Sequence, residues 1–142
     1  DTVRLTRLGF PMIANLSDSL TIPQTILTAR NESLEKNPET AKSFLKALVL
    51  GIQLAKSNKS EAIKAGFEAK LQGEPELVNL AYDLYAPALS ADLSVNMNGL
   101  QFMLDEDKRS GLIDAKFALD RVVNENLLKV AQQELRAEGR FK

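Results

Sequence analysis

Cysteine and histidine are both absent from this chain of 142 residues, and each absence excludes a class of site. Without cysteine the chain has no disulfide, no thiolate nucleophile and no cysteine-based metal centre. Without histidine it cannot build the Ser-His or Cys-His pairs of nucleophilic catalysis, or the usual zinc sites. The common glycine patterns of phosphate-binding loops are also missing. We therefore expect a protein that is not an enzyme and that carries no metal and no cofactor.

An excess of charge of either sign is lacking as well. The 18 basic and 19 acidic residues give a net charge of −1, and the basic residues are scattered along the chain. No global field favours nucleic acid or an anionic membrane surface, so we expect no nucleic-acid partner. No apolar run approaches the ~20 residues of a membrane span. What remains is an ordinary globular composition, 44% apolar and 26% charged, of a length that suits one domain with a modest core.

The longest helical pattern covers residues 37–58 and organises the rest of the chain. Asn37 suits the N-cap, Pro38 suits the first helical position, and Glu39 faces the positive end of the helix dipole. Apolar residues then recur at spacings of three and four, at Ala41, Phe44, Leu45, Leu48, Ile52 and Ala55, with a second stripe at Ala47, Leu50 and Leu54. This pattern predicts a core helix with neighbours on more than one side.

Shorter helical patterns surround this central helix. The chain before Gly9 has the pattern of the last turns of a helix, because glycine suits the left-handed position that follows one. Further helices are predicted at residues 60–73, 75–87, 96–109 and 124–137. Ser60 is the expected N-cap and Gly73 the expected stop of the first of these, and Pro87 kinks or ends the next. The acidic run at residues 105–107 is predicted to be a solvated helix end rather than a calcium loop.

Two stretches have the length and the flanking residues of β-strands. Residues 10–16 form an apolar run between Gly9 and a polar loop, and residues 25–30 follow Pro23. Pro11 cannot donate to a sheet ladder, so it suits only the edge or the beginning of the first strand. Because an isolated pair of strands is marginal in water, we expect at least one partner strand to be missing from this chain.

The polar loop at residues 17–25 joins these two strand candidates and is the most promising site. It offers hydroxyl groups, an amide and backbone N–H groups without an excess of charge, a set that suits a small anion or a polar solute. Judged from the residues alone, a plain connecting loop is the alternative. Tyr82 and Tyr85 lie one helical turn apart, and we interpret them as core or rim packing rather than as a surface for ligand stacking.

Several short stretches of sequence occur one after another along the chain in an order that resembles that of a known family. They are Gly9-Phe10, Ala14-Asn15-Leu16-Ser17-Asp18, Ile22-Pro23-Gln24-Thr25 and the stretch from Leu34 to Ala47, followed by Pro75-Glu76-Leu77, Ala81-Tyr82-Asp83, Gly99-Leu100-Gln101 and Val123-Asn124-Glu125-Asn126-Leu127-Leu128. This order resembles the C-terminal part of the nitrate, sulfonate and taurine group of ABC-importer substrate-binding proteins. The likeness covers nearly the whole chain, and Asn-Pro-Glu-Thr at the start of a long helix is its most specific part.

The resemblance implies an α/β fold of the periplasmic-binding-protein type II class, in which two lobes joined by crossing strands hold a solute in the cleft between them. This chain is then a mostly helical C-terminal fragment with about two short strands. Residues 1–30 form the end of the second lobe and the return hinge strands, and residues 31–142 form helices that pack on a first lobe absent from the chain. The resemblance places Ser17, Gln24 and Thr25 at the cleft as ligand-binding residues, with Pro23 and Thr28 at the hinge.

The function implied by the resemblance is delivery of a small anion or polar organic solute to an ABC importer, without a catalytic step. The partners are the solute, bound in the intact protein, and the membrane permease of the transporter. The location is periplasmic or extracytoplasmic, at the membrane if the protein is a lipoprotein, and a leader would precede the missing lobe. Two alternatives stay open: a free-standing helical interaction domain, and an enzyme related to thiamine-pyrimidine synthases, whose chemistry lies in the first lobe. Unpaired strand edges and bare helix faces also predict self-association of the isolated chain.

Overall fold

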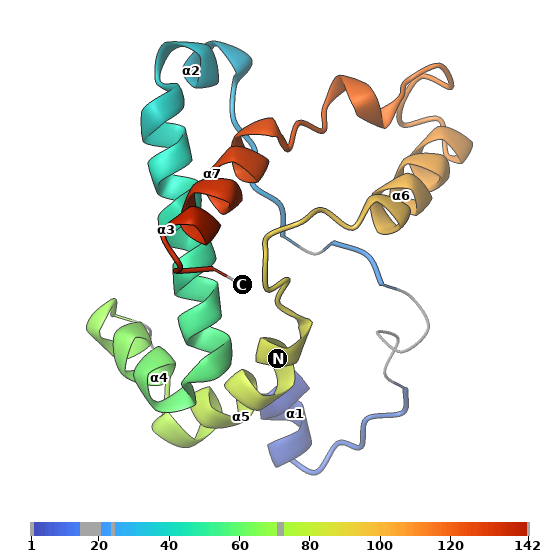
Figure 1. The fold of residues 1–142 in the computed structure, drawn as a ribbon. Coiled ribbons are helices and arrows are strands. Elements are labelled where there is room, and N and C mark those ends of the chain that lie inside the picture. The colour runs from blue at the N-terminus through green and yellow to red at the C-terminus, as the bar shows by residue number, and fades with distance from the viewer. Residues whose placement is uncertain (1, 15–20, 24, 71–72, 142) are drawn as a thin grey trace.

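The computed structural model describes residues 2–14, 21–23, 25–70 and 73–141, which form helices joined by extended connections (Figure 1). The elements, in chain order, are α1 (Thr2–Arg7), α2 (Asn31–Lys36), α3 (Pro38–Ser57), α4 (Lys59–Glu68), α5 (Pro75–Tyr85), the 3₁₀ turn η2 (Ala86–Ala88), α6 (Met97–Arg109), the 3₁₀ turn η3 (Leu119–Arg121) and α7 (Asn126–Ala137). Helix α3 is the longest, α7 crosses it, and α6 stands apart from both (Figure 1).

The predicted α/β fold class is wrong for this chain. The structure is 64% helical, and its described residues contain no strand and no sheet. The described parts of the two strand candidates, residues 10–14 and 25–30, lack regular structure, and their side chains are exposed, that of Ile13 by 97%. Apolar residues in a run of strand length are not enough, because a strand forms only where a neighbour supplies the other half of its hydrogen-bond ladder.

The small core lies where α7 crosses α3. Val49 and Leu135 are fully buried, with Leu128 and Phe141 beside them, and Leu45, Leu50 and Leu93 pack around this cluster. The central helix was predicted correctly, and Pro38 occupies its first turn. Part of its predicted apolar face is nevertheless open, since Phe44 is 57% exposed. The described neighbours of α3 therefore cover only some of the apolar surface that its sequence provides.

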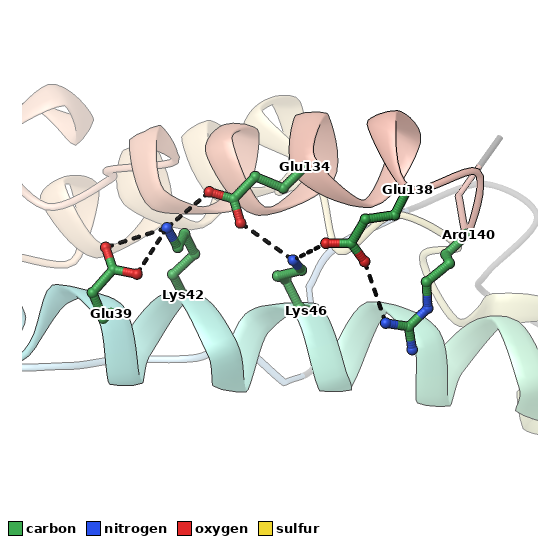
Figure 2. A network of polar contacts seen from close by, with 6 residues as sticks. All are labelled: Glu39, Lys42, Lys46, Glu134, Glu138 and Arg140. Carbon is green, nitrogen blue, oxygen red and sulfur yellow. Dashed lines mark hydrogen bonds and ion pairs between the residues drawn. The ribbon is translucent and has the colours of Figure 1, made fainter.

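A network of ion pairs runs along the edge of the α3–α7 contact (Figure 2). The Lys42 ammonium lies 2.8 Å from Glu134 and 2.9 Å from Glu39, and the Lys46 ammonium lies 2.5 Å from Glu138 and 3.2 Å from Glu134. The hydrogen bond from Lys42 holds the pKa of Glu134 below its usual value, and the hydrogen bond from Lys46 does the same for the pKa of Glu138. Both lysines are mostly covered, so the network adds orientation to the apolar contact that it borders.

Two helices begin directly after an asparagine whose side chain accepts a hydrogen bond from a backbone N–H group of the first turn. The side chain of Asn58, not the predicted Ser60, caps α4 by accepting from the Glu61 N–H at 3.1 Å. Asn96 caps α6 in the same way, accepting from the Gly99 N–H at 2.9 Å. Asn37 precedes α3 as predicted, but its side chain makes no capping bond. Two of the three asparagines thus contribute the hydrogen bond that makes this residue type a preferred N-cap.

Polar anchors hold the region around α5 against its neighbours. The Lys56 ammonium of α3 donates to the carbonyl oxygens of Ala86 at 3.1 Å, Pro87 at 3.3 Å and Leu89 at 2.8 Å. These carbonyls lie at the end of a helical segment, where a cation is favourable. The Tyr82 hydroxyl donates to the Ala55 carbonyl of α3, which agrees with the prediction that Tyr82 packs in the structure. Helix α5 is therefore fixed to α3 by side chains from both.

Candidate functional site

The structure describes three of the five residues that the resemblance assigned to the cleft and hinge. Ser17 and Gln24 lie outside the described residues. Thr25 and Thr28 are exposed in the extended connection before α2, and neither hydrogen-bonds to another described residue through its side chain. Pro23 is half-buried. Of the predicted site, the described part that packs against the rest of the chain is therefore the segment at residues 21–23.

This segment, which we call the crossing segment (residues 21–23), lies against the first turn of α6. The Asn96 amide Nδ2 donates to the Thr21 carbonyl oxygen at 3.1 Å. A Cβ atom placed on Gly99 would lie 2.5 Å from the same oxygen and 2.9 Å from the Pro23 Cδ atom. The backbone of α6 and the crossing segment are thus closer than any side chain at residue 99 would permit. Sequence reasoning missed this contact; its one signal was a glycine in the first turn of a helical pattern.

Two open hollows lie on the other side of the molecule, around α4 and α5. The larger, of about 370 Å³, is lined by Lys59, Ser60, Ile63 and Asn79. The smaller, of about 220 Å³, is lined by Lys56, Tyr82, Asp83, Ala86 and Pro87. The cations in both are already engaged: Lys59 lies 2.6 Å from the Asp83 carboxylate, and Lys56 donates to backbone carbonyls. Neither hollow offers a charged group that is free to bind an anion.

Within the described residues, no group of three or more acidic side chains is arranged to hold a metal ion. The acidic run at residues 105–107 lies within the last turns of α6, where Gln101 donates a hydrogen bond to Asp105 and Arg109 forms an ion pair with Glu106. The run is used for local contacts along the helix surface.

Comparison with known proteins gives no relative: no family model, no curated protein and no solved structure matches this chain. No helix among the described residues is long and apolar enough to cross a membrane. The resemblance noted in the sequence stays a prediction, and function must be argued from surfaces and contacts.

The largest functional feature is exposed apolar surface. The accessible surface of this 15.6 kDa chain is 10876 Å², whereas a compact monomer of that mass exposes about 7,200 Å². Many large apolar side chains are exposed: Leu5, Leu8, Phe10, Met12 and Ile13 around α1, Ile22, Ile26 and Leu27 before α2, Phe44 and Leu54 on α3, Leu80, Leu84 and Tyr85 on α5, and Met97, Phe102 and Met103 on α6. We call this set the open apolar surface. Extended connections and exposed apolar side chains both place the accessible surface above that of a compact monomer.

Proposed function

We propose that this chain is the helical C-terminal portion of a solute-binding component of an ABC importer. The intact protein binds a small anion or polar organic solute of the nitrate, sulfonate, taurine or pyrimidine-precursor class and presents it to the membrane permease, outside the cytoplasm and without a catalytic step. The observation that carries the proposal is the open apolar surface, together with the order of sequence runs that resembles this family. Both agree with a segment that completes its core against the rest of a larger protein.

The spread of the open apolar surface favours a domain-sized neighbour over a second copy of the chain. Its side chains lie on α1, α3, α5 and α6 and on the extended connections before α2. A standard protein–protein interface covers only ~800 Å² on each partner. A neighbour that contacts several helices at once fits this spread better than one interface of that size.

The test is a ligand screen on the intact gene product by thermal denaturation. Nitrate, bicarbonate, taurine, alkanesulfonates and pyrimidine precursors are added at equal ionic strength, with sodium chloride as the control. A ligand at 100 times its Kd stabilises the folded state by ~2.7 kcal/mol, which raises the Tm by several degrees. If no compound in the panel raises the Tm above the chloride control, the proposal is refuted.

A free-standing helical interaction domain is the second candidate, favoured by the absence of strands from the described residues and by the exposed amphipathic helices. It predicts that the 142-residue chain unfolds cooperatively on its own and runs as a monomer or a defined dimer. The solute-binding proposal predicts a gradual unfolding transition and open-ended self-association of the same chain, since most of its core partner is elsewhere. Size-exclusion chromatography with light scattering, combined with urea unfolding, separates the two.

A further inference from the structure

The first turn of α6 contacts the crossing segment in two independent ways. Asn96 uses both ends of its amide: Oδ1 accepts from the Gly99 N–H at 2.9 Å, and Nδ2 donates to the Thr21 carbonyl at 3.1 Å. One side chain therefore caps the helix and binds the segment. This amide therefore joins the first turn of α6 to the crossing segment.

Gly99 makes the close approach possible. A Cβ atom at this position would meet backbone atoms on two sides, the Thr21 oxygen at 2.5 Å and the Ile22 Cα atom at 3.0 Å. Backbone cannot rotate away as a flexible side chain can, so alanine at residue 99 would force the two segments apart. Gly51, in the middle of α3, has nothing within 4 Å of the same added atom. Gly99 and Gly51 therefore differ in what surrounds them.

The start of α6 is itself fixed to α7. The Val95 N–H donates to the Glu125 carboxylate at 2.9 Å, just before α7 begins. The Gln132 amide, buried on α7, donates to the Asp92 carbonyl at 2.7 Å. The connection into α6 is thus held at two points, and the crossing segment is tied through Asn96 to the helix that packs in the core.

We propose that Asn96 and Gly99 are positioning residues that fix the crossing segment and so set the affinity of the intact protein for its solute. The inference rests on the proposed function, because the crossing segment includes Pro23, the residue assigned to the hinge beside the cleft. A protein whose binding-competent arrangement is populated only in part loses apparent affinity by that fraction. Loosening the segment therefore weakens solute binding although neither residue touches the solute.

The test compares matched variants of the intact protein. Asn96→Asp keeps the capping oxygen but replaces the Nδ2 donor by a carboxylate oxygen that repels the Thr21 carbonyl. Asn58→Asp is the control, since Asn58 caps α4 in the same way and its amide nitrogen donates to no described residue. Gly99→Ala and Gly51→Ala form the second pair. Each variant is measured by calorimetry for solute Kd and by hydrogen exchange of peptides that cover residues 21–30.

We expect Asn96→Asp to weaken solute binding about fivefold, the factor that corresponds to one lost hydrogen bond. Gly99→Ala is expected to weaken it at least tenfold, because backbone must shift. Both should speed exchange at residues 21–30, while the two controls stay within twofold of the parent protein in both measurements. Tm without solute should fall more in Asn96→Asp than in Asn58→Asp, because only Asn96 donates to the crossing segment, and exchange should quicken at residues 21–30 rather than throughout the protein, which separates positioning from a general loss of stability.

The two proposals fail in different ways. If the parent protein binds no solute of the panel, the proposed function fails, and exchange at residues 21–30 still reports whether Asn96 and Gly99 fix the segment. If the parent protein binds solute and Asn96→Asp and Gly99→Ala match their controls in both Kd and exchange, the positioning role is overturned while the proposed function stands. Asn96→Ser, which keeps a capping hydroxyl that is too short to reach Thr21, repeats the test if either variant folds poorly.

Discussion

Replacing Leu135 by alanine is expected to destabilise the packing of α7 on α3 by about 3 kcal/mol. Leu135 is fully buried, with a solvent exposure of 0%, and lies in one cluster with Val49, Leu128 and Phe141. Truncation removes its buried methyl groups and leaves a cavity that helical backbones close only in part, which costs ~2–5 kcal/mol for a buried leucine. Because few described side chains are fully buried, this loss is a large share of what holds the two helices together.

The assay is urea unfolding followed by far-UV circular dichroism, with Val130→Ala as the control on the same helix. Val130 is 40% exposed, so its truncation should cost less than about 1 kcal/mol. With a slope of ~1–3 kcal/mol per molar urea, Leu135→Ala should lower the midpoint by about 1–3 M. Equal midpoints for the two variants would refute the packing of α7 on α3 described above.

Two further predictions concern charge and helix caps. Because contacts from their lysine partners lower the folded-state pKa values of Glu134 and Glu138 below the ordinary value of 4.5, the stabilisation from these carboxylates is complete above pH 4.5 and is lost as pH falls through the lower folded values. The urea midpoint should therefore fall between pH 5 and pH 3 by ~1 M or less. The fall should be smaller in Glu134→Gln. The same fall in this variant and in the parent protein would contradict the network. Asn58→Ala should lower the stability by ~1 kcal/mol, since it removes the acceptor for the Glu61 N–H. Asn37→Ala should lower it little, because the Asn37 side chain makes no capping bond. Equal urea midpoints for the two variants would show the cap assignment to be wrong.

Local sequence signals predicted the helices correctly, but they also predicted two strands that the described residues do not form. The apolar periodicity of residues 37–58 predicted α3. Pro38, Pro75 and Asn96 lie at or next to the first residues of α3, α5 and α6, so each of these helices begins where its local signal indicated. The strand candidates depended on partners elsewhere in the chain or outside it. Composition cannot report such partners, so residues 25–30 satisfied every local criterion and still lack a ladder.

Burial and the candidate site needed tertiary information of another kind. The apolar stripe of α3 was correct as a pattern, yet only Val49 lies where α7 packs, and Phe44 stays exposed. Ser60 and Asn58 are both good caps two residues apart, and only the backbone geometry selects Asn58. The sequence around Gly99 gives a helical pattern and no sign of the crossing segment that packs against it.

The contact between α3 and α7 joins residues that are far apart in the chain, since Glu134 follows Lys42 by 92 positions. At the ~5–20 residues per second of protein synthesis, α3 waits about 5–18 s on the ribosome before the residues that cover Val49 are made. During that time α7 cannot cover the apolar face of α3. Slower translation after residue 57 would lengthen the interval in which this face lacks its partner helix.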